Sequence, residues 1–296
     1  MSDTEPSGEP VADWDRETAS SNGESTDDGF LATASARLEE LRHRLGLARD
    51  ISRGSSQTVR PFQPAEDGHL GTFELPAGQQ ELDRYWVNAP FAYVVITYDD
   101  EASERYYHAV EPDLDEFEAA LLGRIKTDIR APLMYQATDK DDVESVLVDE
   151  LKRLIETYGI DVDMSTFHSL FYYLKRDFRG FGKLDPLLTD QHIEDISCDG
   201  YELPIFVYHD DYTDIETNIS FVEQELDNFV IRLAQQSGQH ISVGDPMVEA
   251  TLRDGSRAEL SLGREVTPRG SAFTIRQYAD DPFTPIDLIN YNTFSI

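Results

Sequence analysis

Acidic side chains outnumber basic ones along the whole chain, and this imbalance limits which compact folds the chain can form. Of 296 residues, 58 are Asp or Glu and 25 are Lys or Arg, so the formal net charge at pH 7 is -33. Such a charge keeps a surface hydrated but opposes compaction through self-repulsion. In molar salt the Debye length falls to about 3 Å, and the repulsion is largely screened. The composition therefore predicts a haloarchaeal, salt-adapted protein that loses its structure on desalting.

The same composition excludes several classes of partner and location. Nucleic-acid binding needs a basic surface, and the chain offers no basic footprint of useful size. The single cysteine, Cys198, excludes an intrachain disulfide and fits a reducing compartment. No apolar run reaches the ~20 residues of a membrane span, and the polar N-terminus is unlike a secretory signal. We therefore expect a soluble cytoplasmic protein, peripheral to the inner face of the cell membrane.

The order of polar and apolar segments predicts an α+β protein with two small domains. Residues 1–30 are rich in Ser, Gly, Asp and Glu and are expected to be a disordered acidic tail. Residues 31–80 are expected to form an amphipathic helix and a linker. The two domains, each built of helices and short, mostly antiparallel sheets, are expected at residues 81–175 and 176–279. Residues 280–296 are interpreted as a further interdomain linker.

Apolar patterns place the elements of the first domain. β-Branched and aromatic residues at 91–98 predict a strand, which pairs with residues 105–110 through a turn. Pro112 is expected to open a helix. A 3.6-residue apolar period predicts a helix over 141–158. A further helix is expected to start at a cap residue, Ser165.

The second domain is expected to begin with a loop at residues 180–183. Ser220 and Glu223 match the S-x-x-E pattern of a capping box, which predicts a helix over 221–237. The Asp254-Gly255 pair lies between two alternating segments, which is the strongest short signal of a β-hairpin. Three more strands are expected, at residues 193–199, 205–209 and 271–277.

The sequence contains no complete catalytic motif. A phosphate-binding loop needs the pattern G-x-x-x-x-G-K-[ST]. Lys183 belongs to the only Gly-Lys pair in the chain. Asp177 stands where the pattern needs its first Gly, and Leu184 stands where it needs Ser or Thr. No G-x-S-x-G nucleophile elbow is present either. A loop between domains is therefore the better interpretation of this segment.

Metal-binding patterns are also missing from the sequence. The seven histidines are scattered, and no H-E-x-x-H motif or Cys/His cluster occurs. His209, Asp210 and Asp211 are interpreted as a solvated turn, and Cys198 as a small core residue. We therefore expect no metal site.

Five arginines between residues 250 and 276 form the one group of candidate site residues. Only three acidic residues lie among them, so the segment is a rare net-positive stretch of the chain. Arginine is always charged and forks onto phosphate oxygens, which makes phosphate contact one interpretation. The other is salt bridging within the sheet, to Glu249, Glu259 and Glu265. The arginines are Arg253, Arg257, Arg264, Arg269 and Arg276.

A resemblance to a known family begins at Gly180. The segment GFGKLDPLLTDQHIEDISCDG resembles the pattern G-x-G-x-L-x-P-L-L-x-D-x-x-I-E-D-I-x-x-D-G of secretion and pilus motor ATPases. The later segments at 229–277 and 281–289 are similar to the same family. YWVNAPFAYVVI at 85–96 resembles the first N-terminal domain of its archaeal members. These are the type II/IV secretion ATPases that drive archaellum and type IV pilus assembly, and the resemblance covers roughly residues 80–296.

The resemblance implies a larger molecular plan. Family members carry an N-terminal module and then a RecA-like domain with Walker A and Walker B motifs, and they assemble as hexameric rings on a membrane platform protein. ATP and Mg bind between the two halves of the subunit. This chain stops before a Walker A motif, so the RecA-like domain is absent and we expect no activity from the chain alone. In two places it departs from the family pattern, at Lys183 and at residues 201–203.

Within that plan, the arginines gain a specific role. Arg264 and Arg276 are expected to contact the γ-phosphate of ATP, with Arg257 and Arg269 as weaker candidates. The chain would then be an N-terminal module that contributes arginines to the ATP site, subunit contacts and platform docking. The alternative is a stand-alone, truncated binding or regulatory protein without ATPase activity. A downstream reading frame that encodes G-x-x-x-x-G-K-[ST] would distinguish the first function from the second.

Overall fold

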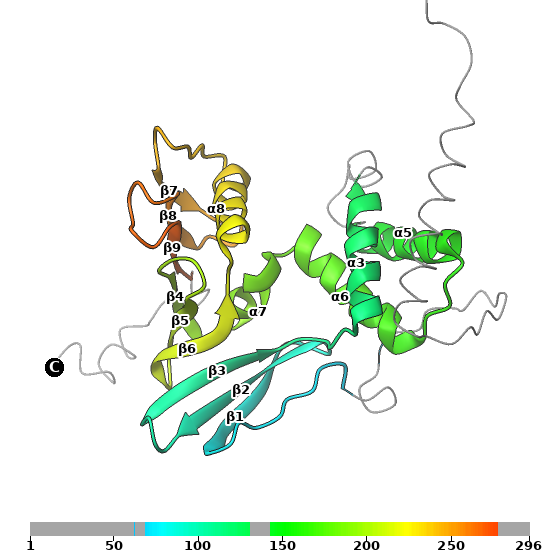
Figure 1. Ribbon diagram of the computed structural model, residues 1–296, viewed down its shortest axis with the longest axis horizontal. Coiled ribbons are helices and arrows are strands. Elements are labelled where there is room, and N and C mark those ends of the chain that lie inside the picture. Colours follow the sequence, from blue (N-terminus) through cyan, green and yellow to red (C-terminus); the bar gives the residue numbers. More distant parts are fainter. Residues whose placement is uncertain (1–61, 63–68, 131–142, 278–296) are drawn as a thin grey trace, which may run out of the picture.

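The computed structural model describes residue 62 and residues 69–130 and 143–277. Figure 1 shows the strands at the bottom and left of the view, a group of helices on the right, and another helix beside the last strands at the upper left. This arrangement confirms the predicted α+β class. The predicted tail at 1–30, the amphipathic helix before residue 50 and the linker at 280–296 lie outside the described residues.

One nine-stranded sheet unites strands from both predicted domains. Its order is β1-β2-β3-β6-β5-β4-β9-β8-β7. Neighbouring strands are antiparallel except β3 and β6, which pair in parallel through Tyr106 with Glu216 and Tyr107 with Thr217. The strands are β1 (Gln79–Asn88), β2 (Ala92–Asp99), β3 (Glu104–Val110), β4 (Ile193–Cys198), β5 (Pro204–His209), β6 (Thr213–Ser220), β7 (Met247–Thr251), β8 (Arg257–Ser261) and β9 (Ala272–Arg276).

Turn chemistry and apolar alternation predict most of these strands. The β2–β3 pair is antiparallel as expected, and β7 and β8 form the hairpin around Gly255, whose φ of 93° suits glycine. The sequence pattern does not predict β1 or β6. Strand β1 is polar and largely exposed, and β6 buries only Ile215 and Thr217, so neither shows the usual apolar alternation.

The helices begin at caps that differ in part from those expected. The helix after Pro112 starts with a capping box between Asp115 and Glu118. The next cap is Asp163 and not Ser165, because the Asp163 carboxylate accepts the Thr166 N–H at 2.8 Å. The helices are α3 (Glu116–Asp128), α5 (Val143–Tyr158), α6 (Met164–Phe178), α7 (Asp185–Thr189) and α8 (Glu223–Gln236).

Two local predictions in the second half are wrong. Ser220 does not cap α8: it is the last residue of β6 and pairs with Pro204, so its extended backbone leaves Val222 at the cap position without a side-chain hydrogen bond. Residues 180–183 are not wholly a loop, because Gly182–Leu184 forms a 3₁₀ turn that leads into α7. For Ser220, pairing with the earlier residue Pro204 decides the local conformation.

The two largest apolar cores of the described residues lie on either side of the junction between helices and sheet. The larger packs the inner face of the sheet against α7 and α8, and it includes Val94 and Ile96 from β2. Cys198, 1% exposed, belongs to it as predicted. The smaller core joins α3, α5 and α6 through residues such as Leu121 and Leu151. None of the described helices has the length and apolar character needed to cross a membrane.

Candidate functional site

The four candidate arginines form two pairs at opposite ends of β8 and β9. Arg257 opens β8 and Arg276 closes β9, and the two are direct partners in the ladder. Arg264 and Arg269 lie in the loop that joins the strands at their other end. A strand of five residues spans roughly 16 Å. The structure therefore does not bring all four arginines to one phosphate.

Arg276 is held on the outer face of the sheet by Asp195, its partner on β4. Its Nε donates to Asp195 Oδ1 at 2.9 Å, and its Nη2 donates to Oδ2 at 3.2 Å. The Arg276 side chain nevertheless remains 75% exposed. The expected salt bridges to Glu249, Glu259 or Glu265 are not the ones formed here.

Arg257 completes a row of three charges across β4, β9 and β8. No carboxylate pairs with Arg257 anywhere in the described part of the chain, and its side chain is exposed. Like charges directly opposite each other in a sheet repel, and Asp195 relieves only the Arg276 side of this pair. An anion between Arg257 and Arg276 would relieve both, so this is the part of the surface that suits a phosphate.

The second pair of arginines holds the β8–β9 loop in place. Nη2 of Arg264 lies 3.5 Å from Glu223 Oε2 at the start of α8, and its guanidinium lies 5.6 Å from the ring centre of Tyr201. Tyr201 donates its N–H to the Arg269 carbonyl at 3.1 Å and its hydroxyl to Asp227 at 2.7 Å. The Arg264 side chain thus contacts the start of α8, whereas Arg269 contributes only its backbone carbonyl to this attachment.

A shallow pocket of about 410 Å³ lies on the outer face beside this loop. Asp199, Glu249 and Glu259 line it, together with apolar side chains such as Met247, and neither Arg257 nor Arg276 does. A carboxylate lining repels anions, so the pocket is not suited to a phosphate group.

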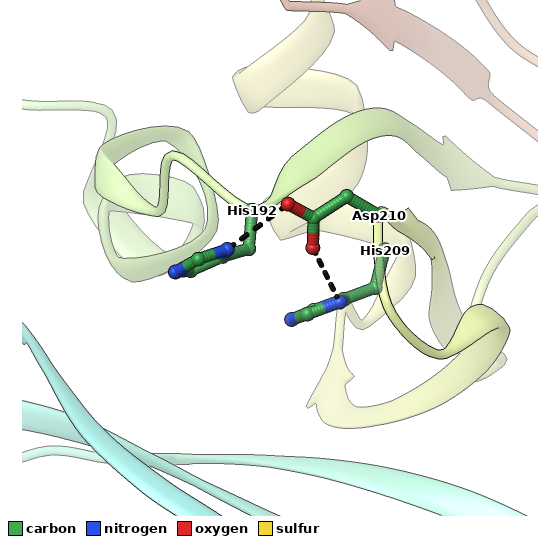
Figure 2. Close-up of side chains that lie close together, drawn as sticks. All are labelled: His192, His209 and Asp210. Carbon is green, nitrogen blue, oxygen red and sulfur yellow. Dashed lines mark hydrogen bonds and ion pairs between the residues drawn. The ribbon is translucent and has the colours of Figure 1, made fainter. Parts of the chain in front are cut away.

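The structure also brings together a group that the sequence did not predict: His192, His209 and Asp210 (Figure 2). His209 is buried, with 1% of its surface exposed, so the interpretation of His209 as part of a solvated turn is wrong. His192 comes 17 positions earlier, and the pairing of Ile193 with His209 in the β4–β5 ladder places the two rings together. No short sequence motif predicts such a contact, because the contact depends on the register between two strands.

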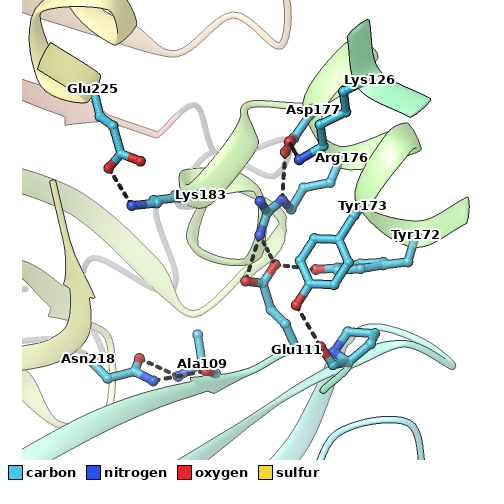
Figure 3. Close-up of polar contacts among 11 residues, drawn as sticks. Ala109, Glu111, Lys126, Tyr172, Tyr173, Arg176, Asp177, Lys183, Asn218 and Glu225 are labelled. Carbon is cyan, nitrogen blue, oxygen red and sulfur yellow. Dashed lines mark hydrogen bonds and ion pairs between the residues drawn. The ribbon is translucent and has the colours of Figure 1, made fainter. Parts of the chain in front are cut away.

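A third polar group joins the helices to the sheet (Figure 3). Arg176 on α6 contacts Glu111, the residue after β3, and Tyr172 donates its hydroxyl to the same carboxylate at 2.7 Å. Asp177 pairs with both Arg176 and Lys126 of α3. These groups are buried and paired, so they position α6 and offer no free ligand atoms.

Comparison with known proteins relates part of the N-terminal half of the chain to a described protein family. Residues 39–113 match the family model described as PilB3-like, N-terminal, and the described part of this match contains β1, β2 and β3. The chain therefore carries a PilB3-like N-terminal domain.

Similarity over a longer stretch defines the family. The uncharacterized protein MJ1288 of Methanocaldococcus jannaschii is 35% identical over 179 residues, which cover 60% of this chain and 71% of MJ1288. The chain belongs to the same family as MJ1288.

Two larger relatives come from the same organism. The uncharacterized protein MJ0900 is 37% identical over 125 residues, which are 42% of this chain and 22% of MJ0900. The uncharacterized protein MJ0781 is 29% identical over 194 residues, which are 65% of this chain and 26% of MJ0781. The matched part is thus about a quarter of each of these two relatives.

Among solved structures, the VirB11 ATPase from the Brucella suis type IV secretion system, in complex with sulphate, is similar to part of the chain. The sequence identity is 20%, the match covers 38% of this chain and 33% of VirB11, and the TM-score is 0.33. A similarity at this level carries no conclusion about function.

Proposed function

We propose that this chain is the N-terminal module of a secretion or pilus assembly ATPase. The PilB3-like domain at residues 39–113 supports this class of machine. The motif segments that begin at Gly180 resemble the same class over the rest of the chain. In this proposal the module belongs to a hexameric ring that docks to a membrane platform protein at the cytoplasmic face, and a RecA-like domain supplies the loop that binds ATP and Mg²⁺.

Within this module, Arg276 and Arg257 face the phosphates of the bound ATP. One observation carries this assignment: the β8–β9 register makes Arg257 and Arg276 direct partners, and both side chains are exposed. Arg264 is less suited, because its guanidinium lies near Glu223 and Tyr201, and the loop that carries both Arg264 and Arg269 lies at the other end of the two strands. The proposal therefore favours Arg276 with Arg257 as the phosphate-facing pair.

The chemical role of this pair is electrostatic. Negative charge spreads over the oxygens of a phosphoryl group during transfer, and guanidinium groups stabilise that charge. Arg257 is available in the described structure, whereas Arg276 must leave Asp195 or share its donors with the phosphate. Asp195 would thus hold Arg276 extended until nucleotide arrives.

The test measures ATP hydrolysis by rings that contain this chain and a Walker A-bearing ATPase domain. Arg276→Ala and Arg257→Ala should each lower kcat by on the order of 10³-fold, the range of an arginine that stabilises phosphoryl transfer. Arg253→Ala, in the exposed β7–β8 turn, is the matched control for charge and should leave kcat unchanged. Rings that hydrolyse ATP normally with both site substitutions would refute the arginine role. Failure of the chain to enter such rings would refute the proposal that it is the N-terminal module of such an ATPase.

A further inference from the structure

Two imidazole rings from separate segments face one carboxylate beside the β4–β5 hairpin (Figure 2). Nδ1 of His192 lies 3.1 Å from Asp210 Oδ2, and Nδ1 of His209 lies 3.0 Å from Asp210 Oδ1. The two rings are stacked, 5.4 Å apart and 9° from parallel. One ligand atom from each of the three residues lies within 4.8 Å of the others.

The hydrogen bonds around His209 assign its proton. The Tyr85 hydroxyl donates to Asp190 Oδ2 at 2.8 Å, and Tyr107 donates to the same oxygen. The Tyr85 oxygen is therefore an acceptor for His209 Nε2, which lies 3.1 Å away. Neutral His209 must then carry its proton on Nε2, which leaves a lone pair on Nδ1.

That lone pair lies close to a carboxylate oxygen, which is also rich in electrons. Nδ1 accepts the Asp211 N–H at 3.1 Å, but Asp210 Oδ1 lies equally close to the same nitrogen. Two lone-pair atoms at this distance repel unless a cation lies between them.

We propose that His192, His209 and Asp210 bind one divalent transition-metal ion, with Zn²⁺ as the reference case and water as the fourth ligand. Two imidazole nitrogens and one carboxylate oxygen are a ligand set that proteins use for Zn²⁺ with an open position. Metal-bound histidines commonly donate their other N–H to a second group that orients the ring. His209 does so here, through Tyr85 to Asp190.

Two of the three ligand side chains are free to adjust to an ion, since His192 and Asp210 are 48% and 45% exposed at the side chain. His209 is oriented by Tyr85, and an ion bound at its Nδ1 would displace the Asp211 N–H from that nitrogen. A small rotation of the Asp210 carboxylate would free the space between the two Nδ1 atoms. The bound ion would then join the start of β4 to the end of β5, while Tyr85 of β1 orients the His209 ring from its other side.

The experiment titrates Zn²⁺ into the chelator-treated full chain by calorimetry in molar KCl. We expect one ion per chain and a higher Tm in its presence. His192→Ala and Asp210→Asn should weaken binding by about 100-fold or more, and Tyr85→Phe by about 10- to 100-fold, the range for an outer partner. His240→Ala, an exposed histidine outside the cluster, is the matched control and should bind as the unaltered chain does.

Co²⁺ in place of Zn²⁺ gives a second readout that is independent of stability. A four-coordinate Co²⁺ site absorbs strongly in the visible range, and His192→Ala should abolish this band while far-UV circular dichroism stays unchanged. Absence of stoichiometric binding, or binding that survives both His192→Ala and Asp210→Asn, would overturn the proposal. So would a His209 that titrates with protons in NMR spectra but is unaffected by either metal.

Discussion

Nη1 of Arg176 lies 2.7 Å from each carboxylate oxygen of Glu111 (Figure 3), so the last turn of α6 is attached to the end of β3. The Arg176 side chain is only 10% exposed, and its Nε also donates to Asp177 at 2.8 Å. Tyr172 donates to Glu111 from the same helix. The orientation of the helical group relative to the sheet therefore depends on one buried guanidinium.

Removal of that guanidinium should be costly. Arg176→Ala leaves the partly buried Glu111 without its charge partner. A broken, fully buried pair costs about 3–5 kcal/mol of unfolding free energy, which is the upper limit here. Arg153→Ala is the control, since Arg153 pairs with Glu150 on α5 but is 57% exposed, and it should cost less than about 1 kcal/mol. Urea unfolding in molar KCl measures both. Similar losses in the two variants would contradict the structural role of Arg176.

Acid should weaken the same junction through Asp177. Burial alone would raise the pKa of Asp177, but Arg176 and Lys126 outweigh it and hold the pKa below its ordinary value of 3.8. A carboxylate with a lowered folded-state pKa contributes stability that is complete above the unfolded-state value and lost as the pH falls through the folded-state value. The stability difference between the unaltered chain and Asp177→Asn should therefore be constant above pH ~5 and shrink below pH ~4. Urea unfolding at a series of pH values checks this, and a difference that does not vary with pH would refute it.

Gly200 should tolerate no side chain. Its φ is +145°, and a Cβ there would lie 2.6 Å from the carbonyl oxygen and the Cβ of Arg269. Gly200→Ala should therefore strain the end of β4 and displace the β8–β9 loop, at a cost of roughly 1–3 kcal/mol. Gly123→Ala is the opposite case, because Gly123 lies in α3 with open space around its Cα, and it should stabilise the helix by about 1 kcal/mol. The two Tm values should shift in opposite directions, and a shift of the same sign in both would count against this account.

Salt should control whether the chain folds. With a net charge of -33, repulsion between carboxylates reaches about 10 Å in 0.1 M salt and about 3 Å in 1 M salt. Far-UV circular dichroism and thermal unfolding should show a cooperative fold in molar KCl and its loss on dialysis into dilute buffer. A sharp unfolding transition that persists without salt would contradict the predicted adaptation.

Sequence patterns predicted helices and strands well where all the residues that form the pattern lie in one segment. Asp254 and Gly255 between two alternating segments predicted the β7–β8 hairpin, and the segment at 221–237 was correctly predicted to contain the helix α8. Strand β6 was not predicted, because its own residues bury little apolar surface and it is held by pairing with β5 and β3.

The candidate site was likewise predicted in part from the sequence and decided in part by the tertiary structure. The sequence indicated that arginines gather between residues 250 and 276, and the resemblance implied a phosphate partner. Only the β8–β9 register selected Arg257 with Arg276 and separated them from Arg264. In the same way, only the β4–β5 pairing placed His192 against His209.

The sequence by itself determined the α+β class, the helices with a clear 3.6-residue period and the hairpin turns, because periodicity and turn chemistry act between residues near in the chain. Tertiary structure alone decided that β3 pairs in parallel with β6, which merges two predicted domains into one sheet. It also decided the partners of Arg176, Arg276 and His209. Such contacts join residues up to 124 positions apart, as between Tyr85 and His209. Their geometry follows from strand register and core packing, which no short stretch of sequence encodes.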